Sequence, residues 1–300
     1  MPTFAKSLVL GFIAFFFIAW LITACSSSGR RNGKNTEKPR IVVSIGPQIF
    51  FVRNIAGDRV EVSSLLGGSS DPETFEPSVA QFKELEDADA YLPLGTLPFE
   101  SGVKERMKQS RRKTRIFDVS SGVELLYETH GHNGHSHNVP DPHIWSSPVN
   151  AKTMALNTLD ALVAVDPANE NVYRSNYARL DARLDAIDSS FRKAFDSIPT
   201  APTFMVWHPS LSYFARDYGL KQLALNDMSK ETSVKGYIDR LNEAREAGAS
   251  VYFYQQEFDA SRTESIAKET GVKVVEISPM NEEWEDEMQK LYDAFTTDKP

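Results

Sequence analysis

The sequence lacks several features that would point to common classes of protein. Among its 300 residues there is one cysteine, Cys25, so the chain cannot form an internal disulfide. Lysine and arginine number 33 against 41 aspartates and glutamates, a net charge of −8, which gives no basic footprint for nucleic acid. Neither an HExxH run nor a Gly-x-Ser-x-Gly elbow occurs, so the motifs of common metalloproteases and serine hydrolases are missing.

The long apolar run of the chain lies at the N-terminus, from Leu8 to Ile22, and Lys6 precedes it. A positive residue before an apolar stretch of this length predicts a secretory signal peptide over residues 1–24 rather than a spanning helix. Ile22-Thr23-Ala24-Cys25 resembles a bacterial lipobox, which implies cleavage before Cys25 and lipid attachment to it. The alternative is an uncleaved signal anchor that contains a cysteine by chance.

The segment from Ser26 to Lys38 is polar, and its composition predicts a flexible tether over residues 25–39. Such a tether would hold the protein on the extracytoplasmic side of a membrane, in the periplasm or at the cell surface. Cleavage would also remove Lys6 and leave 32 basic against 41 acidic residues, or −9, a balance that suits a soluble binder of cations. About 260 residues remain, enough for two lobes of ordinary size.

Beyond the tether, short β-branched runs alternate with helical patterns, which predicts parallel sheets covered by helices. The expected strands are Ile41–Ile45, Val60–Leu66, Ala90–Leu94 and Arg115–Val119, then Thr203–Trp207, Lys221–Leu225, Val251–Tyr254 and Val272–Ile277. The expected helices are Pro47–Gly57, Ser78–Glu86 and Val149–Val165, then Ser210–Tyr218, Val234–Ala247, Ser261–Thr270 and Asn281–Phe295. The pattern therefore predicts two similar α/β lobes, over residues 40–165 and 199–300.

Residues 166–198 separate these two regions and carry one apolar stripe with steps of three and four residues. About thirty helical residues would span roughly 45 Å, which exceeds one small lobe. The stripe therefore predicts a single long helix that joins the lobes. An ordinary core helix or a coiled-coil arm is the alternative.

The six histidines are unevenly distributed, and imidazole is the commonest metal-ligating side chain. Two of them are His143 and His208, and the other four lie in a stretch rich in Gly, Asn and Ser, at His130, His132, His135 and His137. The composition of residues 130–137 predicts an exposed, flexible loop. This loop is either an auxiliary, low-affinity zinc collector or a solvated segment that binds metal only in the test tube.

Several motifs, in order along the chain, resemble those of the metal-binding (zinc/manganese-type) ABC transporter substrate-binding lipoproteins. The resemblance runs from about Ile41 to the C-terminus. It rests on Ser44-Ile45-Gly46-Pro47, Asp71-Pro72-Glu73-Thr74-Phe75-Glu76-Pro77-Ser78, Asp141-Pro142-His143-Ile144-Trp145-Ser146-Ser147-Pro148, Trp207-His208-Pro209-Ser210-Leu211-Ser212-Tyr213-Phe214 and Glu276-Ile277-Ser278-Pro279-Met280.

The resemblance implies a monomeric solute-binding lipoprotein that captures a divalent transition metal in a cleft between the lobes. It would deliver the ion, as cargo, to an ABC permease in the cytoplasmic membrane. The resemblance carries over His143 and His208 as ligands, and Glu73 where the family usually has histidine. Ser278 stands where the family often has aspartate, so the fourth ligand is left open between this region, Glu257 and a water molecule.

Donor chemistry favours zinc over manganese for this set. One carboxylate and two imidazoles suit Zn²⁺ in a tetrahedral site at about 2.0–2.2 Å. Mn²⁺ prefers oxygen ligands and higher coordination, so it is the alternative ion. The competing hypotheses are a zinc metalloenzyme, since three ligands leave one position open, and an adhesin or scaffold with structural metal. Glu73 could also be a helix N-terminal acid, His143 a buried histidine bonded to a carbonyl, and Asp141 a turn residue or a partner of a ligand.

Overall fold

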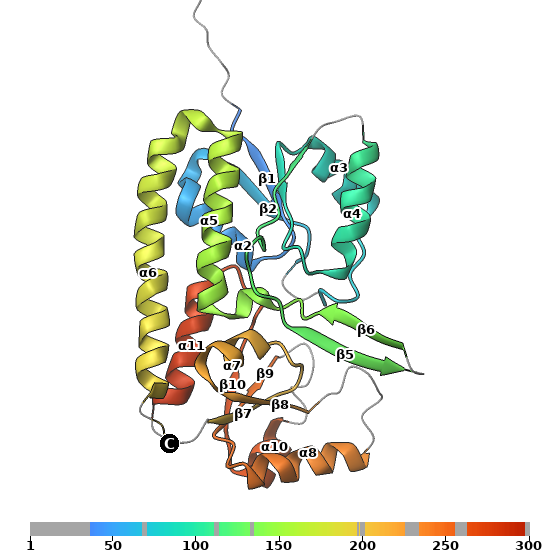
Figure 1. Ribbon diagram of the computed structural model, residues 1–300, viewed down its shortest axis with the longest axis vertical. Helices are drawn as coiled ribbons and strands as arrows, with labels where there is room; N and C mark the ends of the chain where they lie inside the picture. The colour runs from blue at the N-terminus through green and yellow to red at the C-terminus, as the bar shows by residue number, and fades with distance from the viewer. Residues whose placement is uncertain are drawn as a thin grey trace, which may run out of the picture. The chain divides into compact units, whose positions relative to one another are not determined.

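The protein is described here by a computed structural model (Figure 1). The structure describes residues 37–67, 71–110, 114–132, 135–196, 198, 202–225, 234–255 and 263–297, with the backbone alone for 128–132, 135–138 and 234. The predicted signal peptide, Cys25 and the tether up to residue 36 lie outside this part. Met1–Lys38 and Pro39–Pro300 form separate units, and the second is the folded body. Within the described residues, no helix has both the length and the apolar character to cross a membrane.

The first lobe is built on a parallel sheet of four strands in the order β2-β1-β3-β4. The strands are β1 (Arg40–Val43), β2 (Glu61–Ser64), β3 (Ala90–Leu92) and β4 (Arg115–Ile116). In the centre of the sheet Ile41 lies opposite Val62 and Ala90. Buried residues run continuously along β1 and β3 because helices cover both faces of a parallel sheet.

The helices of this lobe begin and end where local chemistry dictates. They are α2 (Pro47–Ala56), α3 (Val79–Asp87), α4 (Pro98–Gln109) and α5 (Pro148–Val165). Proline opens α2, and Gly57, with a φ of 61°, ends it. Ser78 caps α3 in a capping box with Gln81. Helix α4 was not predicted, since it carries only a sparse apolar face and has Gly102 in its middle.

The histidine-rich stretch forms a hairpin and not the flexible loop that its composition predicts. Strand β5 (Tyr127–His132) pairs in antiparallel register with β6 (His135–Pro140), which places His130 opposite His137 and His132 opposite His135. The intervening Asn133-Gly134, outside the described residues, is a pair typical of two-residue hairpin turns, a signal that outweighs the polar composition.

A 27-residue helix, α6 (Glu170–Asp196), follows the first lobe and spans about 40 Å. Figure 1 shows α6 alongside α5, and it also contacts α2 near one end and α7 and α11 near the other. Its buried residues continue along the whole length, and they are Tyr173, Leu180, Leu184, Phe191 and Phe195. The predicted long helix between the lobes is therefore confirmed.

The second lobe repeats the topology of the first. Its parallel strands are β7 (Thr203–Val206), β8 (Lys221–Ala224), β9 (Val251–Tyr254) and β10 (Lys273–Glu276), in the order β10-β9-β7-β8. Its helices are α7 (Ser212–Tyr218), α8 (Val234–Glu246), α10 (Thr263–Thr270) and α11 (Trp284–Thr296). In each lobe the first strand lies between the second and the third, so the prediction of two similar α/β lobes is confirmed.

One hydrophobic core extends through both lobes. On β7, Phe204 and Val206 belong to the same cluster as the residues of β1, α2, α5 and α6. Met205, between them, points to a second cluster beneath α8 and α10. The lobes therefore share apolar packing and are not two bodies joined only by a hinge.

Candidate metal centre

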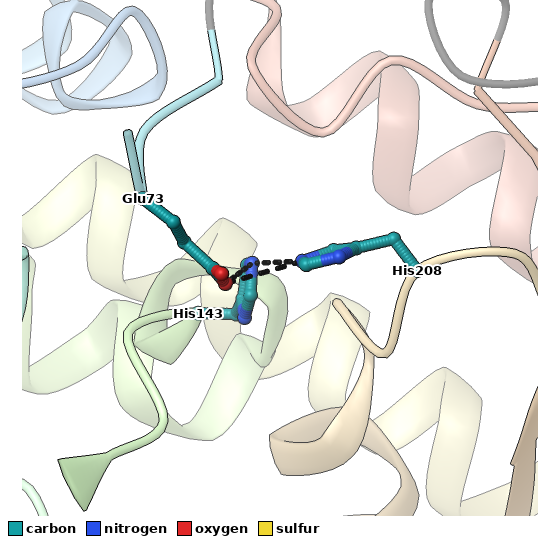
Figure 2. A group of neighbouring side chains, drawn as sticks. All are labelled: Glu73, His143 and His208. Carbon is teal, nitrogen blue, oxygen red and sulfur yellow. Dashed lines mark hydrogen bonds and ion pairs between the residues drawn. The ribbon is translucent and has the colours of Figure 1, made fainter. Parts of the chain in front are cut away.

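Three segments that are far apart in the sequence bring one donor side chain each to a common point (Figure 2). Glu73 lies in the turn that follows β2, and His208 lies two residues after β7. His143 precedes a short 3₁₀ turn (Ile144–Ser146) that leads into α5. In open α/β sheets ligands bind beyond the carboxyl ends of the strands, where the strand order reverses. His208 fits this rule because it follows β7, and β7 lies between β8 and β9, where the strand order reverses.

The three donor atoms form a triangle of the size that a tetrahedral metal ion needs. Nε2 of His143 lies 3.0 Å from Nε2 of His208. Oε1 of Glu73 lies 3.3 Å from Nε2 of His208 and 3.8 Å from Nε2 of His143. Donors at the usual zinc distances in a tetrahedron are about 3.3 Å apart. Two ring nitrogens that face each other this closely need a shared proton or a metal ion between them.

The three side chains differ in how far they are exposed to solvent. The side chains of His143 and His208 are 5% and 8% exposed, whereas that of Glu73 is 23% exposed. The carboxylate therefore closes the solvent side of the site, and the imidazoles form its interior.

The orientation of His143 is set by Asp141. One oxygen of this carboxylate, Oδ1, accepts the backbone N–H of His143 and lies 2.9 Å from Nδ1 of its ring. With the Nδ1 proton directed to Asp141, the lone pair of Nε2 faces His208 and Glu73. This carboxylate–histidine arrangement fixes the tautomer and raises the basicity of metal-ligating imidazoles. Asp141 therefore acts through His143 and is not itself part of the triangle.

Both carboxylates remain ionised at neutral pH. Burial alone would raise the pKa of Asp141, but hydrogen bonds from His143 and Ser212 and the electrostatic attraction of His143 lower it below its usual value. Burial likewise opposes ionisation of Glu73, but the hydrogen bond with His208 and the electrostatic attraction of the two histidines lower its pKa. The site is therefore prepared for a cation.

A local turn holds Glu73 in place. Oδ1 of Asp71 accepts the backbone N–H of Glu73 at 2.9 Å, and Oδ2 accepts the hydroxyl of Thr74 at 3.0 Å. Phe75 then packs edge-on against Phe99, with ring centroids 4.9 Å apart. These contacts all come from the first lobe.

Contacts that the sequence analysis missed anchor the turn after His143 to the second lobe. Trp145 donates its indole N–H to the carbonyl of Pro279 at 2.9 Å, and Trp284 donates to the carbonyl of Trp145 at 2.7 Å. Nearby, a Cβ on Gly46 would lie 2.5 Å from the carbonyl oxygen of Met280. The glycine therefore allows this close approach of the two lobes. The motifs contain Gly46, Trp145, Pro279 and Met280 but not Trp284, and no periodicity distinguishes these residues from ordinary core positions.

The other predicted site residues do not join the triangle. The backbone N–H of Ser278 donates to Glu287 at 2.8 Å, and the group of three donors does not include Ser278. Glu257 lies outside the described residues, as do the side chains of the four hairpin histidines. The fourth position of the shell thus has no assigned protein ligand among the described residues.

A family model and a solved structure both match most of this chain. The model of the family described as zinc-uptake complex component A, periplasmic (ZnuA), matches residues 41–297. A crystal structure of ZnuA superposes with a TM-score of 0.75 at 31% identity, covering 85% of this chain and 97% of that one.

Curated relatives carry names for two metals. The zinc-binding protein AdcA of Streptococcus pyogenes serotype M3 is 28% identical over 96% of this chain, and the AdcA of Streptococcus pneumoniae serotype 4 is named a zinc-binding lipoprotein. This chain spans only 58% of the length of the former. The manganese ABC transporter substrate-binding lipoprotein PsaA of Streptococcus anginosus is 24% identical over 88% of this chain and 87% of its own length.

Proposed function

Since the chain belongs to the family of the periplasmic component A of zinc-uptake complexes, we propose that it is the substrate-binding component of an ABC importer for Zn²⁺. Glu73, His143 and His208 capture the ion, and a permease in the cytoplasmic membrane receives it. The observation that carries this proposal is the triangle of donors with edges of 3.0, 3.3 and 3.8 Å. Its size and its mixture of nitrogen and oxygen match the preferences of zinc.

Manganese is the second candidate cargo because a relative is named for it. Mn²⁺ takes more ligands and prefers oxygen. The triangle offers one carboxylate and two imidazoles, and Ser278 stands where a carboxylate would add a second charged oxygen. This donor set favours Zn²⁺. A water molecule, Glu257 or the region of Ser278 completes the coordination shell of the ion.

A catalytic role has less support. The open fourth position would suit a zinc hydrolase. However, the chain contains no HExxH run, and the relatives reported above are named for metal binding or transport and not for an enzymatic reaction. Zinc-dependent hydrolysis that disappears in His143→Ala would revive this role. A purely structural metal is also disfavoured, because the extended shared core predicts a protein that folds without zinc.

We also propose how the chain is attached and divided. Residues 1–24 are the signal peptide, Cys25 carries lipid, and residues 25–39 tether a monomer to the extracytoplasmic face of the membrane. The lobes comprise 40–165 and 199–300, with 166–198 as the linking helix. The family description as periplasmic and the naming of two relatives as lipoproteins support this topology.

The β5–β6 hairpin supplies an auxiliary role in this proposal. His130, His132, His135 and His137 collect zinc with low affinity and raise its concentration near the site. The antiparallel register supports this role because it pairs histidine with histidine twice. Substitution of these residues therefore affects additional weak binding and leaves the tight site intact.

A competitive titration of Zn²⁺ against Mn²⁺ tests the proposed function. Wild type is compared with Glu73→Ala and with Glu76→Ala, a control that removes an exposed carboxylate from the same loop. We expect wild type to prefer zinc, Glu73→Ala to raise the zinc Kd by more than about tenfold, and Glu76→Ala to match wild type. A wild-type protein without tight zinc binding would refute the function, and an unchanged Kd in Glu73→Ala would remove that residue from the site.

A further inference from the structure

The hydroxyl group of Tyr213 lies where the second lobe meets the segment that carries His143. Tyr213 belongs to α7, is completely buried, and follows His208 closely in the sequence. Its hydroxyl donates to the backbone carbonyl of Asp141 at 2.8 Å and accepts the backbone N–H of Leu126 at 3.1 Å. Leu126 and Asp141 flank the β5–β6 hairpin and are themselves joined by a backbone hydrogen bond of 2.9 Å. Tyr213 therefore closes the base of the hairpin.

Asp141 transmits the position of this hydroxyl to the metal site. Its carboxylate holds both the backbone N–H and Nδ1 of His143, at 2.9 Å each. A displacement of the Asp141 backbone would therefore turn the imidazole and move its Nε2. A single residue thus separates the Tyr213 hydroxyl from a metal-ligating side chain.

Further contacts fix α7 itself against the first lobe. Ser147, which caps α5, donates its hydroxyl to the carboxylate of Asp217. Arg216 donates to the backbone carbonyl of Glu124 at 2.7 Å. Because Arg216 and Asp217 hold α7 one turn after Tyr213, the tyrosine hydroxyl has a fixed position from which it can orient Asp141.

We infer that Tyr213 is a positioning residue of the metal site, whose hydroxyl fixes the Asp141–His143 segment against α7 and so sets the spacing of His143 and His208. The inference rests on the proposed function of this site in metal binding. Zinc–nitrogen distances vary by only about 0.1 Å, so an imidazole that moves by more than this loses affinity. Burial also raises the pKa of Tyr213 to about 12, which keeps the donated proton in place at neutral pH.

The pair Tyr213→Phe and Tyr218→Phe tests the inference. Both substitutions remove one buried hydroxyl from the same helix, but the hydroxyl of Tyr218 donates to Asp188 of α6 at 2.9 Å, away from the metal site. We expect Tyr213→Phe to raise the zinc Kd by about tenfold or more, the effect of losing an outer partner of a ligand, and Tyr218→Phe to leave it within about twofold. The visible absorption spectrum of bound Co²⁺ should change in Tyr213→Phe alone.

The outcomes separate positioning from simple stabilisation. If both variants melt at a lower temperature without zinc but bind zinc and Co²⁺ as wild type does, Tyr213 is merely structural and the inference is wrong. A wild-type protein that fails to bind zinc would instead overturn the proposed function. These two failures are therefore distinguishable.

A measurement on the wild-type protein covers the case in which Tyr213→Phe does not fold. If the Tyr213 contacts favour zinc binding, zinc must favour those contacts to the same extent. Zinc should then slow amide hydrogen exchange at Leu126 more than at Val119, whose N–H donates to the carbonyl of Pro93 at 3.1 Å in the same lobe. Equal slowing at both amides would contradict the inference.

Discussion

The histidine pair and the Glu73 turn form the same site but are held by different means. His143 is oriented by Asp141, and its segment is anchored to the second lobe through Tyr213 and Trp145. Glu73 is held by a turn made within its own segment and is the more exposed ligand. The His143 imidazole is therefore preformed by contacts between the lobes, whereas the Glu73 carboxylate depends on local structure. The comparison teaches that the lobes are fixed around the imidazoles and that the carboxylate completes the site.

Substitution of the two kinds of ligand should have unequal effects. We expect His143→Ala to raise the zinc Kd by at least about a hundredfold, and by more than Glu73→Ala does, because water replaces an exposed carboxylate more easily than a buried imidazole. Isothermal titration or a competing chelator measures both affinities. Equal losses of zinc affinity in the two variants would contradict the distinction between the buried imidazole and the exposed carboxylate.

Asp141→Asn should weaken the orientation of His143 and leave the turn that holds Glu73 unchanged. We expect the zinc Kd to rise by about 10–100-fold, since the neutral amide orients His143 less firmly. The lowered pKa of Asp141 also has a consequence for the metal-free protein.

Because the pKa of Asp141 is lowered in the folded state, its contribution to stability is complete above the pKa of an unfolded aspartate, about 3.9, and disappears as the pH falls through the folded-state pKa. The difference in unfolding free energy between wild type and Asp141→Asn should therefore be largest near neutrality and shrink in acid. Denaturant unfolding at several pH values measures it, and a difference independent of pH would contradict the assignment.

Gly46→Ala tests the close contact between the lobes. Its Cβ would meet the carbonyl oxygen of Met280 at 2.5 Å, so backbone must shift, and we expect a loss of about 1–3 kcal/mol in unfolding free energy. Gly102→Ala is the matched control, because nothing lies within 4 Å of its Cβ and it occupies the middle of α4. The control should gain about 0.5–1 kcal/mol. Urea unfolding that shows equal changes would argue against tight packing of the lobes.

The smallest expected effect on the tight site comes from the hairpin. Replacing all four of its histidines by asparagine should leave the Kd of the tight zinc site within about twofold and remove only weaker equivalents of bound zinc. The number of zinc ions bound per protein, measured by equilibrium dialysis for this variant and for wild type in parallel, distinguishes the tight site from the weaker sites. A large loss of tight binding would make the hairpin part of the primary site.

Much of this arrangement follows from the sequence. Periodicity located the strands of both sheets and the long helix α6, because buried runs and a continuous apolar stripe depend on local spacing. It missed α4, whose stability comes from packing and from its Pro98 start, and the hairpin, whose polar residues hid the turn signal of Asn133-Gly134.

The sequence likewise predicts one part of the metal site and misses another. Motifs singled out Glu73, His143 and His208, and the structure brings all three together. The roles of Tyr213 and Gly46 depend on contacts between residues far apart in the chain, which no local pattern encodes. In the sequence Tyr213 is one more apolar position of a helix.

Anomalous scattering at the zinc edge from crystals of the zinc-loaded protein tests the central claim most directly. We predict one strong peak about 2.0–2.2 Å from Oε1 of Glu73 and from Nε2 of both His143 and His208. A zinc-loaded crystal whose strong peak lies elsewhere, for example at the hairpin histidines alone, would contradict the account.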